Sequence, residues 1–467
     1  MNNTPLEALS IRDAHRRLRD GSLSVQALVT QACDRHRLSA DTYQAYATWS
    51  GEQALAAAAH IDALLATGLD AGPLMGIPVS VKDLFAVPGL PTYAGSSLRL
   101  PPEWQQPGPL MRRTLEQLVS VMGKTHTVEF AFGGLGTNAH WGTPRNPWDL
   151  QQHRTPGGSS SGAGVSLIEG SALLAFGTDT AGSVRIPAAM TGVTALKTTS
   201  GRWPAQGVVP LSSTLDTPGI LANTVDDLAF AFDAIDPQLN PTVPRHQSIP
   251  ELSSLRLGVP ETFFWEDCSP GIAEAVMSAI DTLARQGAQI VTLDLPRCDE
   301  AYSLFRSGGV AASELSAFLR KQLPGHISQL DPNVAQRIEA ADALAAWEYV
   351  DRRAALNSMA ESAKAALAGI DALLTPTVAI TPPTLASLEP EGAYAKANML
   401  ALRNTMIGNF MNLTGLTMPV GKDAAGMPVG LQLLAAPWTE SRLLAIGRAM
   451  EKVLGTRHEI LGQPPQP

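Results

Sequence analysis

The spacing of apolar residues along the chain changes near residue 75. Before that point apolar side chains recur at intervals of three and four, which is typical of amphipathic helices. The pattern predicts helices over residues 13–19, 24–37 and 52–65, the second capped by Ser24. Beyond it, short β-rich runs alternate with helical or glycine-rich segments, as in PVSVKDL, QLVSVMGK, ALLAFG and GVTALK. This alternation predicts an α/β sheet centred between residues 75 and 235.

The second half of the chain continues the alternation. The predicted elements are strands at 255–259 and 289–293 around a helix at 272–286, helical segments over 301–370, an extended passage from Leu373 to Pro376, a hairpin of 416–420 with 428–434, and a helix over 439–454. No internal repeat and no convincing linker is visible. We therefore expect one large domain rather than several.

Composition indicates a folded, loop-rich protein. Of the 467 residues, 45% are hydrophobic and 16% charged, with 40 Gly and 35 Pro, which excludes a disordered polyampholyte and a coiled coil. The net charge is −9, so the chain has no basic field that would attract nucleic acid or an anionic membrane. We expect neither as a direct partner.

Cysteine usage and apolar runs predict where the protein resides. Cys33, Cys268 and Cys298 are an odd set, far apart and without a CxxC pair, which argues against a disulfide framework and a zinc site. The N-terminal MNNTPLEALSIRDAH lacks the basic and apolar regions of a secretory signal. The most apolar long run, Ala54 to Leu69, contains charged and polar residues and is too short to span a bilayer. A cytoplasmic location is predicted.

The stretch from Thr155 to Arg202 is the most unusual part of the sequence. It is dense in Gly, Ser and Thr, which is typical of a flexible loop, but apolar runs such as ALLAFG and VRIPAAM interrupt it. A disordered linker would not contain such runs. We therefore expect this stretch to be folded into the core, where its glycines let backbone amides approach a ligand and form an anion site beside a serine.

Two short motifs match known patterns in the wrong context. Residues 158–162 satisfy GxSxG, the nucleophile elbow of α/β-hydrolases, but the preceding DLQQHRTPG is polar and contains proline where the elbow needs a hydrophobic strand. Residues 134–139 mimic a GxGxxA dinucleotide fingerprint, but HWGTPRNP follows in place of the required helix. We reject both interpretations.

Several longer blocks carry a more specific pattern. They are a Gly-Gly-Ser-Ser segment at 157–162, GTDTAGSVRIP at 177–187, GIPVSVKD at 76–83, GKT at 123–125 with Glu129, Phe130 and Asn138, NLTG at 412–415 and GMPVGLQ at 426–432. In content and spacing these blocks resemble the amidase signature family over about residues 10–454. Ala181, Thr198 and His126 depart from the family's usual Gly, Pro and Asn, which affects the expected shape of the pocket.

The resemblance implies a fold. The amidase signature fold is a single large α/β domain with a central mixed, mostly parallel twisted sheet covered by helices on both faces. In this chain it would occupy residues 1–467, with an N-terminal helical layer at 10–70, a catalytic core at 75–235 and a helical substrate-pocket region at 300–400.

The resemblance also implies a reaction and the residues that perform it. By motif position Ser183 is the nucleophile, Lys82 is the base, and Ser159, after a cis peptide bond from Gly158, bridges them. The implied activity is hydrolysis of the C–N bond of an amide, or of a carbamate or ester, through an acyl-enzyme. It needs no cofactor and no metal.

Elementary chemistry agrees with these roles. A serine hydroxyl is a weak nucleophile and needs an adjacent base, and a lysine serves as that base only when neutral. Lys82 alternates with Val79 and Val81 in a short strand, where burial favours the uncharged amine. The candidate oxyanion donors are the backbone amides of the turn after ALLAFG, which belong to Thr180, Ala181, Gly182 and Ser183.

Three supporting residues have two roles open. Ser160 either braces Lys82, as the resemblance implies, or caps the helix that starts there. Asp179 and Arg185 either pair to fix the turn, or Arg185 binds a carboxylate of the substrate.

His126, His140 and His153 lie near the same blocks and offer a Ser–His hydrolase as an alternative, although none has an acid at a recognisable spacing.

The walls of the substrate pocket are expected from residues 126–141, 301–325 and 376–410. Apolar and Met-rich side chains predominate there and favour an apolar or aryl substrate; they are Phe130, Phe132, Trp141, Phe305, Met399 and Met406, with Met411 just beyond. The predicted partner is a small-molecule amide or carbamate substrate. The sequence leaves open whether the protein forms a homodimer. Two rival hypotheses are the glutaminase subunit of a transamidation complex and a purely binding protein.

Overall fold

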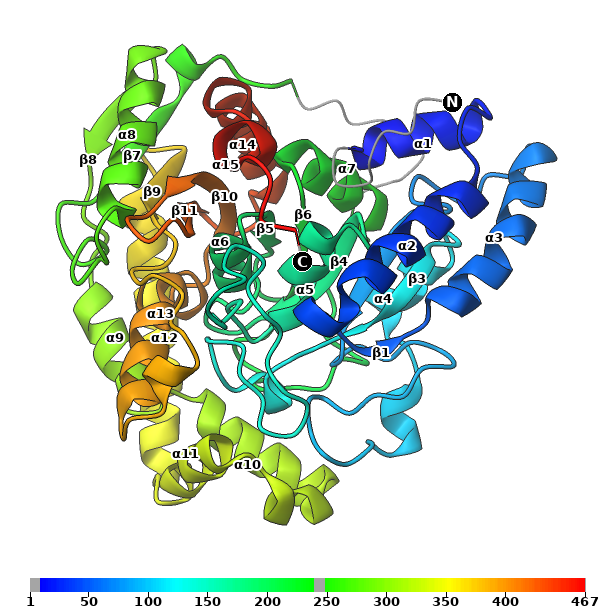
Figure 1. Ribbon diagram of the computed structural model, residues 1–467. Helices are drawn as coiled ribbons and strands as arrows, with labels where there is room; N and C mark the ends of the chain where they lie inside the picture. The colour runs from blue at the N-terminus through cyan, green and yellow to red at the C-terminus, as the bar shows by residue number, and fades with distance from the viewer. Residues whose placement is uncertain (1–8, 239–247, 467) are drawn as a thin grey trace.

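An eleven-stranded sheet forms the centre of the computed structural model, which describes residues 9–238 and 248–466. Its strand order is β1-β3-β2-β4-β6-β5-β10-β11-β9-β7-β8 (Figure 1). The strands are β1 (Tyr46–Trp49), β2 (Pro78–Lys82), β3 (Ser120–Thr125), β4 (Leu174–Asp179), β5 (Thr194–Lys197), β6 (Thr217–Ala222), β7 (Arg256–Val259), β8 (Gln289–Thr292), β9 (Ala372–Pro376), β10 (Thr414–Lys422) and β11 (Pro428–Ala435).

The α-helices surround this sheet. They are α1 (Ile11–Arg19), α2 (Val25–Tyr43), α3 (Gly51–Ala66), α4 (Pro109–Leu115), α5 (Ser161–Glu169), α6 (Arg185–Thr191), α7 (Val225–Ile235), α8 (Ile272–Arg285), α9 (Cys298–Arg306), α10 (Ala311–Gln322), α11 (Pro332–Asp342), α12 (Ala346–Leu367), α13 (Ala393–Phe410), α14 (Glu440–Leu454) and α15 (Arg457–Leu461). In Figure 1, α1 to α3 lie together at one side and α9 to α13 at the other.

The pairing of the strands is mixed. β2 runs parallel to β3 and β4, and β7 runs parallel to β8 and β9. The remaining six pairings between neighbours are antiparallel. They are β1 with β3, β4 with β6, β6 with β5, β5 with β10, β10 with β11, and β11 with β9. The α/β class and the mixed sheet are confirmed, whereas the expectation of a mostly parallel sheet is wrong.

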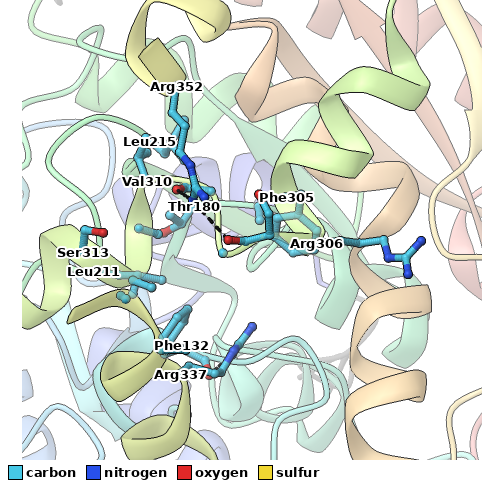
Figure 2. Close-up of a pocket in the computed structure, with 18 of the residues that line it drawn as sticks. Phe132, Thr180, Leu211, Leu215, Phe305, Arg306, Val310, Ser313, Arg337 and Arg352 are labelled. Carbon is cyan, nitrogen blue, oxygen red and sulfur yellow. Dashed lines mark hydrogen bonds between the residues drawn. The ribbon is translucent and has the colours of Figure 1, made fainter. Parts of the chain in front are cut away.

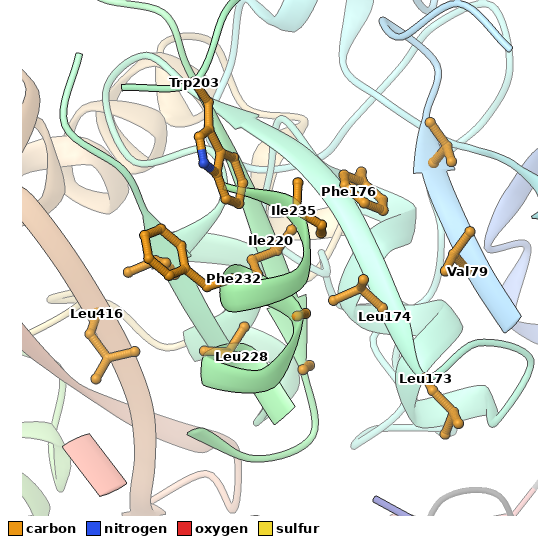
Figure 3. Packing of buried hydrophobic residues seen from close by; sticks show 14 of the residues in the cluster. Val79, Leu173, Leu174, Phe176, Trp203, Ile220, Leu228, Phe232, Ile235 and Leu416 are labelled. Carbon is orange, nitrogen blue, oxygen red and sulfur yellow. The ribbon is translucent and has the colours of Figure 1, made fainter. Parts of the chain in front are cut away.

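Helices cover both faces of the central strands. On β4, Leu174 and Phe176 pack into a cluster with α7 residues such as Leu228 and Phe232 (Figure 3). The intervening Ala175 belongs to a different cluster, formed with α5 and α6. Because side chains of a strand alternate between the faces, the two clusters lie on opposite sides of the sheet, as expected.

Most elements lie where the hydrophobic pattern predicts them. The three N-terminal helices are present as α1, α2 and α3, although α2 continues to Tyr43. The predicted hairpin is present as β10 and β11, and the helix after it as α14. The sequence analysis missed β1 and β6.

Two further predictions concern the chain as a whole. Within the two described ranges, no helix has the length and apolar character needed to cross a membrane. The thiols of Cys33, Cys268 and Cys298 are free. Residues 1–8, which carry much of the segment predicted to lack a secretory signal, lie outside the described residues.

Candidate active site

Lys82 is the last residue of β2, a strand buried along its whole length between β3 and β4. Its side chain is inaccessible to solvent, and its Nζ donates hydrogen bonds of 2.7 Å to Ser159 Oγ and of 2.7 Å to Thr178 Oγ1. Burial lowers the pKa of Lys82 to about 7, although the carboxylates of Asp216 and Asp179 favour its protonated form. A neutral amine is therefore accessible near neutral pH.

Two loops bring Ser159 and Ser183 to the same place. The Gly158–Ser159 peptide bond is cis, as the resemblance implies. The amide of Ser160 donates to the carbonyl oxygen of Ser183 at 3.2 Å, which joins the loop before α5 to the turn before α6. Ser183 is 3% exposed and lines a cavity. Lys82, Ser159 and Ser183, which are distant in sequence, thus belong to one cluster.

The turn before Ser183 is fixed by Asp179. The amide of Gly182 donates to Asp179 Oδ1 at 2.8 Å, so this amide is already engaged. Three of the predicted oxyanion donors remain, the amides of Thr180, Ala181 and Ser183. Gly182 has φ +131°, and a Cβ on it would lie 2.0 Å from Thr405 Oγ1, so only glycine fits there.

Arg185 lies beneath the same turn and is completely buried. Its Nε and Nη2 bind the two oxygens of Asp179 at 3.0 and 2.9 Å, Nη2 also reaches Asn409 Oδ1, and Nη1 donates to Gln432 Oε1. Burial alone would raise the pKa of Asp179, but the guanidinium lowers it to about 2. Because all three nitrogens have protein partners, Arg185 is paired with Asp179 and is not free to bind a substrate carboxylate.

Replacing Arg185 with alanine is expected to lower the free energy of unfolding by about 3–5 kcal/mol, because it leaves the Asp179 carboxylate buried without its cation. Denaturant unfolding monitored by circular dichroism measures this change. The control is Arg442→Ala, which removes the cation of a partly exposed pair with Asp371 and should change the stability by no more than about 1 kcal/mol. Equal effects of the two substitutions would contradict a special role for the buried pair.

The hydroxyl of Ser160 has neither of its two predicted partners. It donates to the carbonyl oxygen of Thr178 at 3.4 Å, and it makes no side-chain cap at the start of α5. The second polar partner of Lys82 is instead the hydroxyl of Thr178, which the sequence analysis missed. The signal for it was present, since Thr178 belongs to the GTD block on the strand next to β2.

Among the described residues, none of the three predicted histidines makes a hydrogen bond to Ser183. Burial lowers the pKa of His126 to about 4, and within the described chain its Nδ1 has no hydrogen-bond partner. His140 Nε2 lies 3.2 Å from Glu129 Oε1, an acid that the sequence analysis did not connect with it. His153 Nε2 bonds to the carbonyl oxygen of Thr143 at 2.9 Å. The histidine side chains in the described ranges make no hydrogen bond to Ser183, so the Ser–His alternative gains no support.

A cavity of about 500 Å³ has Ser183 in its lining. Figure 2 shows part of its wall, with Thr180, Phe132 and Phe305 labelled. Of the predicted wall residues, Phe132, Phe305 and Met399 line it. Three others, Phe130, Met406 and Met411, are buried in the core, and the Trp141 indole donates to the carbonyl oxygen of Ser96 away from the lining. The sequence analysis missed the contributions of Leu211 and Leu215, and of helices α11 and α12.

The cavity lining includes three arginines, Arg306, Arg337 and Arg352. Arg337 lies beside Phe132 in Figure 2, with its guanidinium 3.9 Å from the ring centroid and Nη1 2.8 Å from the Phe132 carbonyl oxygen. Arg352 donates to the carbonyl oxygens of Ser307 and Gly309. In the part of the chain that the structure describes, none of the three forms an ion pair with a carboxylate. Burial lowers the pKa of Arg337, as expected for a desolvated cation without a counter-ion.

Comparisons with known proteins identify the family. Residues 27–444 match the family model described as Amidase. The chain is 52% identical to the 2-amino-5-chloromuconic acid deaminase of Comamonas testosteroni, over 98% of this chain and 99% of that protein. It is 31% identical to one subunit of the glutamyl-tRNA(Gln) amidotransferase of a Cyanothece species, over 95% of this chain and 97% of that protein.

Solved structures give the same result. A structure described as an amidase superposes with a TM-score of 0.86 at 29% identity, covering 96% of this chain and all of that one. The peptide amidase of Stenotrophomonas maltophilia superposes with a TM-score of 0.82 at 26% identity, covering 99% of each chain. The match of family model, relatives and fold over nearly the whole chain shows that this protein belongs to the amidase signature family of hydrolases, which act on carbon–nitrogen bonds.

Proposed function

We propose that this protein cleaves its substrate through a covalent intermediate on Ser183, with Lys82 and Ser159 as the proton relay. The observation that carries the proposal is the 2.7 Å contact between Lys82 Nζ and Ser159 Oγ in a solvent-excluded cluster beside Ser183. A lysine takes a proton from a hydroxyl only when it is neutral. A pKa of about 7 supports that role at ordinary pH.

In the proposed reaction the proton moves along the relay and then returns. Lys82 takes the proton of Ser159 while Ser159 takes that of Ser183, whose Oγ bonds to the carbon that carries the nitrogen. For an amide, the backbone amides of Thr180, Ala181 and Ser183 hold the oxygen that becomes negative. For an amide, the C–N bond breaks as the relay returns a proton to the leaving nitrogen, and water then repeats the sequence to release the acid. A 2-amino-substituted unsaturated acid reacts as its imine tautomer: Ser183 Oγ adds to the C=N carbon, ammonia leaves, and water then displaces the serine to give the 2-oxo acid.

The substrate we propose is a small acid whose nitrogen group leaves as ammonia. The apolar side chains of Phe132, Phe305 and Met399 agree with the expected preference for an apolar group. The guanidinium of Arg337 favours a substrate with an anionic end. A desolvated cation without a carboxylate partner is stabilised by a carboxylate of the ligand. A short apolar or unsaturated chain that ends in a carboxylate combines both features.

The relative at 52% identity supports an acidic substrate, since its name specifies an amino-substituted muconic acid, which is a dicarboxylic acid. Ammonia release is the test. The panel is 2-aminomuconate and the half-amides of dicarboxylic acids, compared with acetamide, acetanilide, an N-aryl carbamate and glutamine. We expect kcat/KM to be highest for the dicarboxylic derivatives. Faster turnover of the neutral anilide or carbamate would overturn the anionic part of the proposal.

Arg337 provides a direct test of substrate charge. Arg337→Gln is expected to lower kcat/KM for the dicarboxylic substrates about tenfold or more, because it removes a charge-assisted hydrogen bond to the carboxylate. Acetamide lacks the carboxylate and should lose much less. Steady-state kinetics on both substrates measures the difference, with the exposed Arg320→Gln, outside the cavity, as the matched control. Equal losses on both substrates would indicate a structural role for Arg337 through Phe132.

The relative at 31% identity keeps the glutaminase hypothesis as a second candidate. Turnover of glutamine by the chain alone at the rate of the dicarboxylic substrates would favour it. We also propose that residues 1–467 form one amidase signature domain, with its catalytic core at 75–235. The proposal is supported by a single sheet that joins strands from Tyr46 to Ala435.

A further inference from the structure

Asp216 connects two parts of the cavity wall. It lies in the loop that leads into β6 and is partly buried. Its Oδ1 accepts a hydrogen bond of 2.6 Å from the hydroxyl of Thr180, and its Oδ2 accepts from the amides of Leu211 and Ser212 at 2.9 and 3.0 Å. Thr180 and Leu211 both line the cavity. One carboxylate therefore joins the turn before Ser183 to the neighbouring wall loop.

The charge of Asp216 acts on Lys82 as well. Two carboxylates raise the pKa of the Lys82 amine through their charge, those of Asp216 and of Asp179 on β4. Asp179 is paired with Arg185, whereas the hydrogen bonds that Asp216 accepts come from neutral donors. Burial raises the pKa of Asp216 to about 6, so it remains largely ionised at neutral pH.

One more acid lies in the same region. Glu314 of α10 accepts hydrogen bonds from the hydroxyls of Ser212 and Thr214, in the loop that ends at Asp216. It is not among the charges that act on Lys82. Glu314 thus supports the loop, and it differs from Asp216 in not being one of the carboxylates that raise the pKa of Lys82.

We propose that Asp216 is a positioning residue of the active site, which holds the Thr180 hydroxyl at the turn before Ser183 and contributes a negative charge that acts on Lys82. The inference rests on the proposed function, because it gives Lys82 the role of base. Asp216 touches neither substrate nor reacting atoms in this role. It acts through Thr180 and Lys82.

The charge of Asp216 determines the direction in which its removal shifts the midpoint of the pH–rate profile. Ionised Asp216 stabilises the ammonium form of Lys82, so it delays the appearance of the neutral base as the pH rises. Asp216→Asn removes the charge but keeps the loop contacts, because its oxygen can accept from the amides of Leu211 and Ser212 while its NH2 donates to the Thr180 hydroxyl. The pH at which the rate is half-maximal should therefore fall, by about half a unit or more. A residue that only supported the loop would not move this midpoint.

The experiment uses the full chain and a fluorophosphonate probe, whose rate of reaction with Ser183 is followed between about pH 5 and 9. Asp216→Asn and Asp216→Ser should both shift the midpoint to lower pH, and Glu314→Gln should leave it in place. An unmoved midpoint in both Asp216 variants, or a shift to higher pH, would overturn the inference. Absence of wild-type labelling at Ser183 would instead overturn the proposed function, so the two failures are distinguishable.

Thr180→Val tests the holding role separately. It removes the hydroxyl that binds Asp216 Oδ1 while both charges stay in place. We expect the plateau rate of labelling to fall about tenfold, because the turn that carries the amide donors loses its connection to the neighbouring wall loop, and we expect no downward shift of the midpoint. An unchanged plateau rate would overturn the positional part of the inference.

Discussion

Ser183→Ala is expected to abolish turnover while the fold remains intact. The substitution removes the only atom proposed to form a bond to the substrate, and loss of a serine nucleophile typically lowers kcat by about 10⁴-fold or more. Ser183 Oγ makes no hydrogen bond that the structure records within the described ranges, so its loss should leave the packing unchanged. Ammonia release and circular dichroism of the same preparation measure the two effects.

The control for this prediction is another buried serine of the same segment. Ser161 starts α5, and its hydroxyl has no hydrogen-bond partner in the described part of the chain. Ser161→Ala should therefore retain most of the activity. A fluorophosphonate probe should label the wild type at Ser183. Labelling at Ser160 would contradict the assignment and would favour the GxSxG elbow that the sequence analysis rejected.

The hydrophobic pattern predicted elements whose core residues are contiguous in sequence. β2, β4 and β10 each contain a short run rich in apolar residues, so their strands were evident before any tertiary contact was known. β6 was missed because its sequence, TPGILA, contains the proline and glycine that usually indicate a turn. Pro218 lies opposite Thr178 in a central strand, and the pairing of β6 with both β4 and β5 overrides that local preference.

The site was predictable to the extent that its residues lie in motif blocks. Lys82, Ser159 and Ser183 could be named because each lies in a block with a characteristic spacing. Arg337 could not, because it lies in α11 without a motif, and its contact with the distant Phe132 at the cavity is a tertiary contact. Asp216 was missed for a related reason, since its importance depends on a hydrogen bond from Thr180 and an electrostatic effect on Lys82 that both cross between elements.

Lys82 should determine the acid side of the pH–rate profile. With a pKa of about 7, the neutral amine is the minority form below pH 7 and the majority form above it, so kcat/KM should rise with pH and level off in mildly alkaline solution. Lys82→Ala removes the base and should lower kcat/KM by about 10³-fold or more. The profile of the wild type and the residual rate of the variant are both measured by ammonia release.

A second buried lysine makes the assignment testable. Burial also lowers the pKa of Lys197 to about 7, but its Nζ donates to the carbonyl oxygens of Thr198 and Leu413, away from the serines. Lys197→Met should therefore leave the midpoint of the pH–rate profile unchanged. Lys82→Ala, in contrast, should remove most of the kcat/KM whose pH dependence the profile records. A midpoint near about 6.5 that disappears on replacement of His140 or His153 would contradict the lysine base, because that is the usual range of an imidazole. His126 could not produce it, since burial holds its pKa near 4.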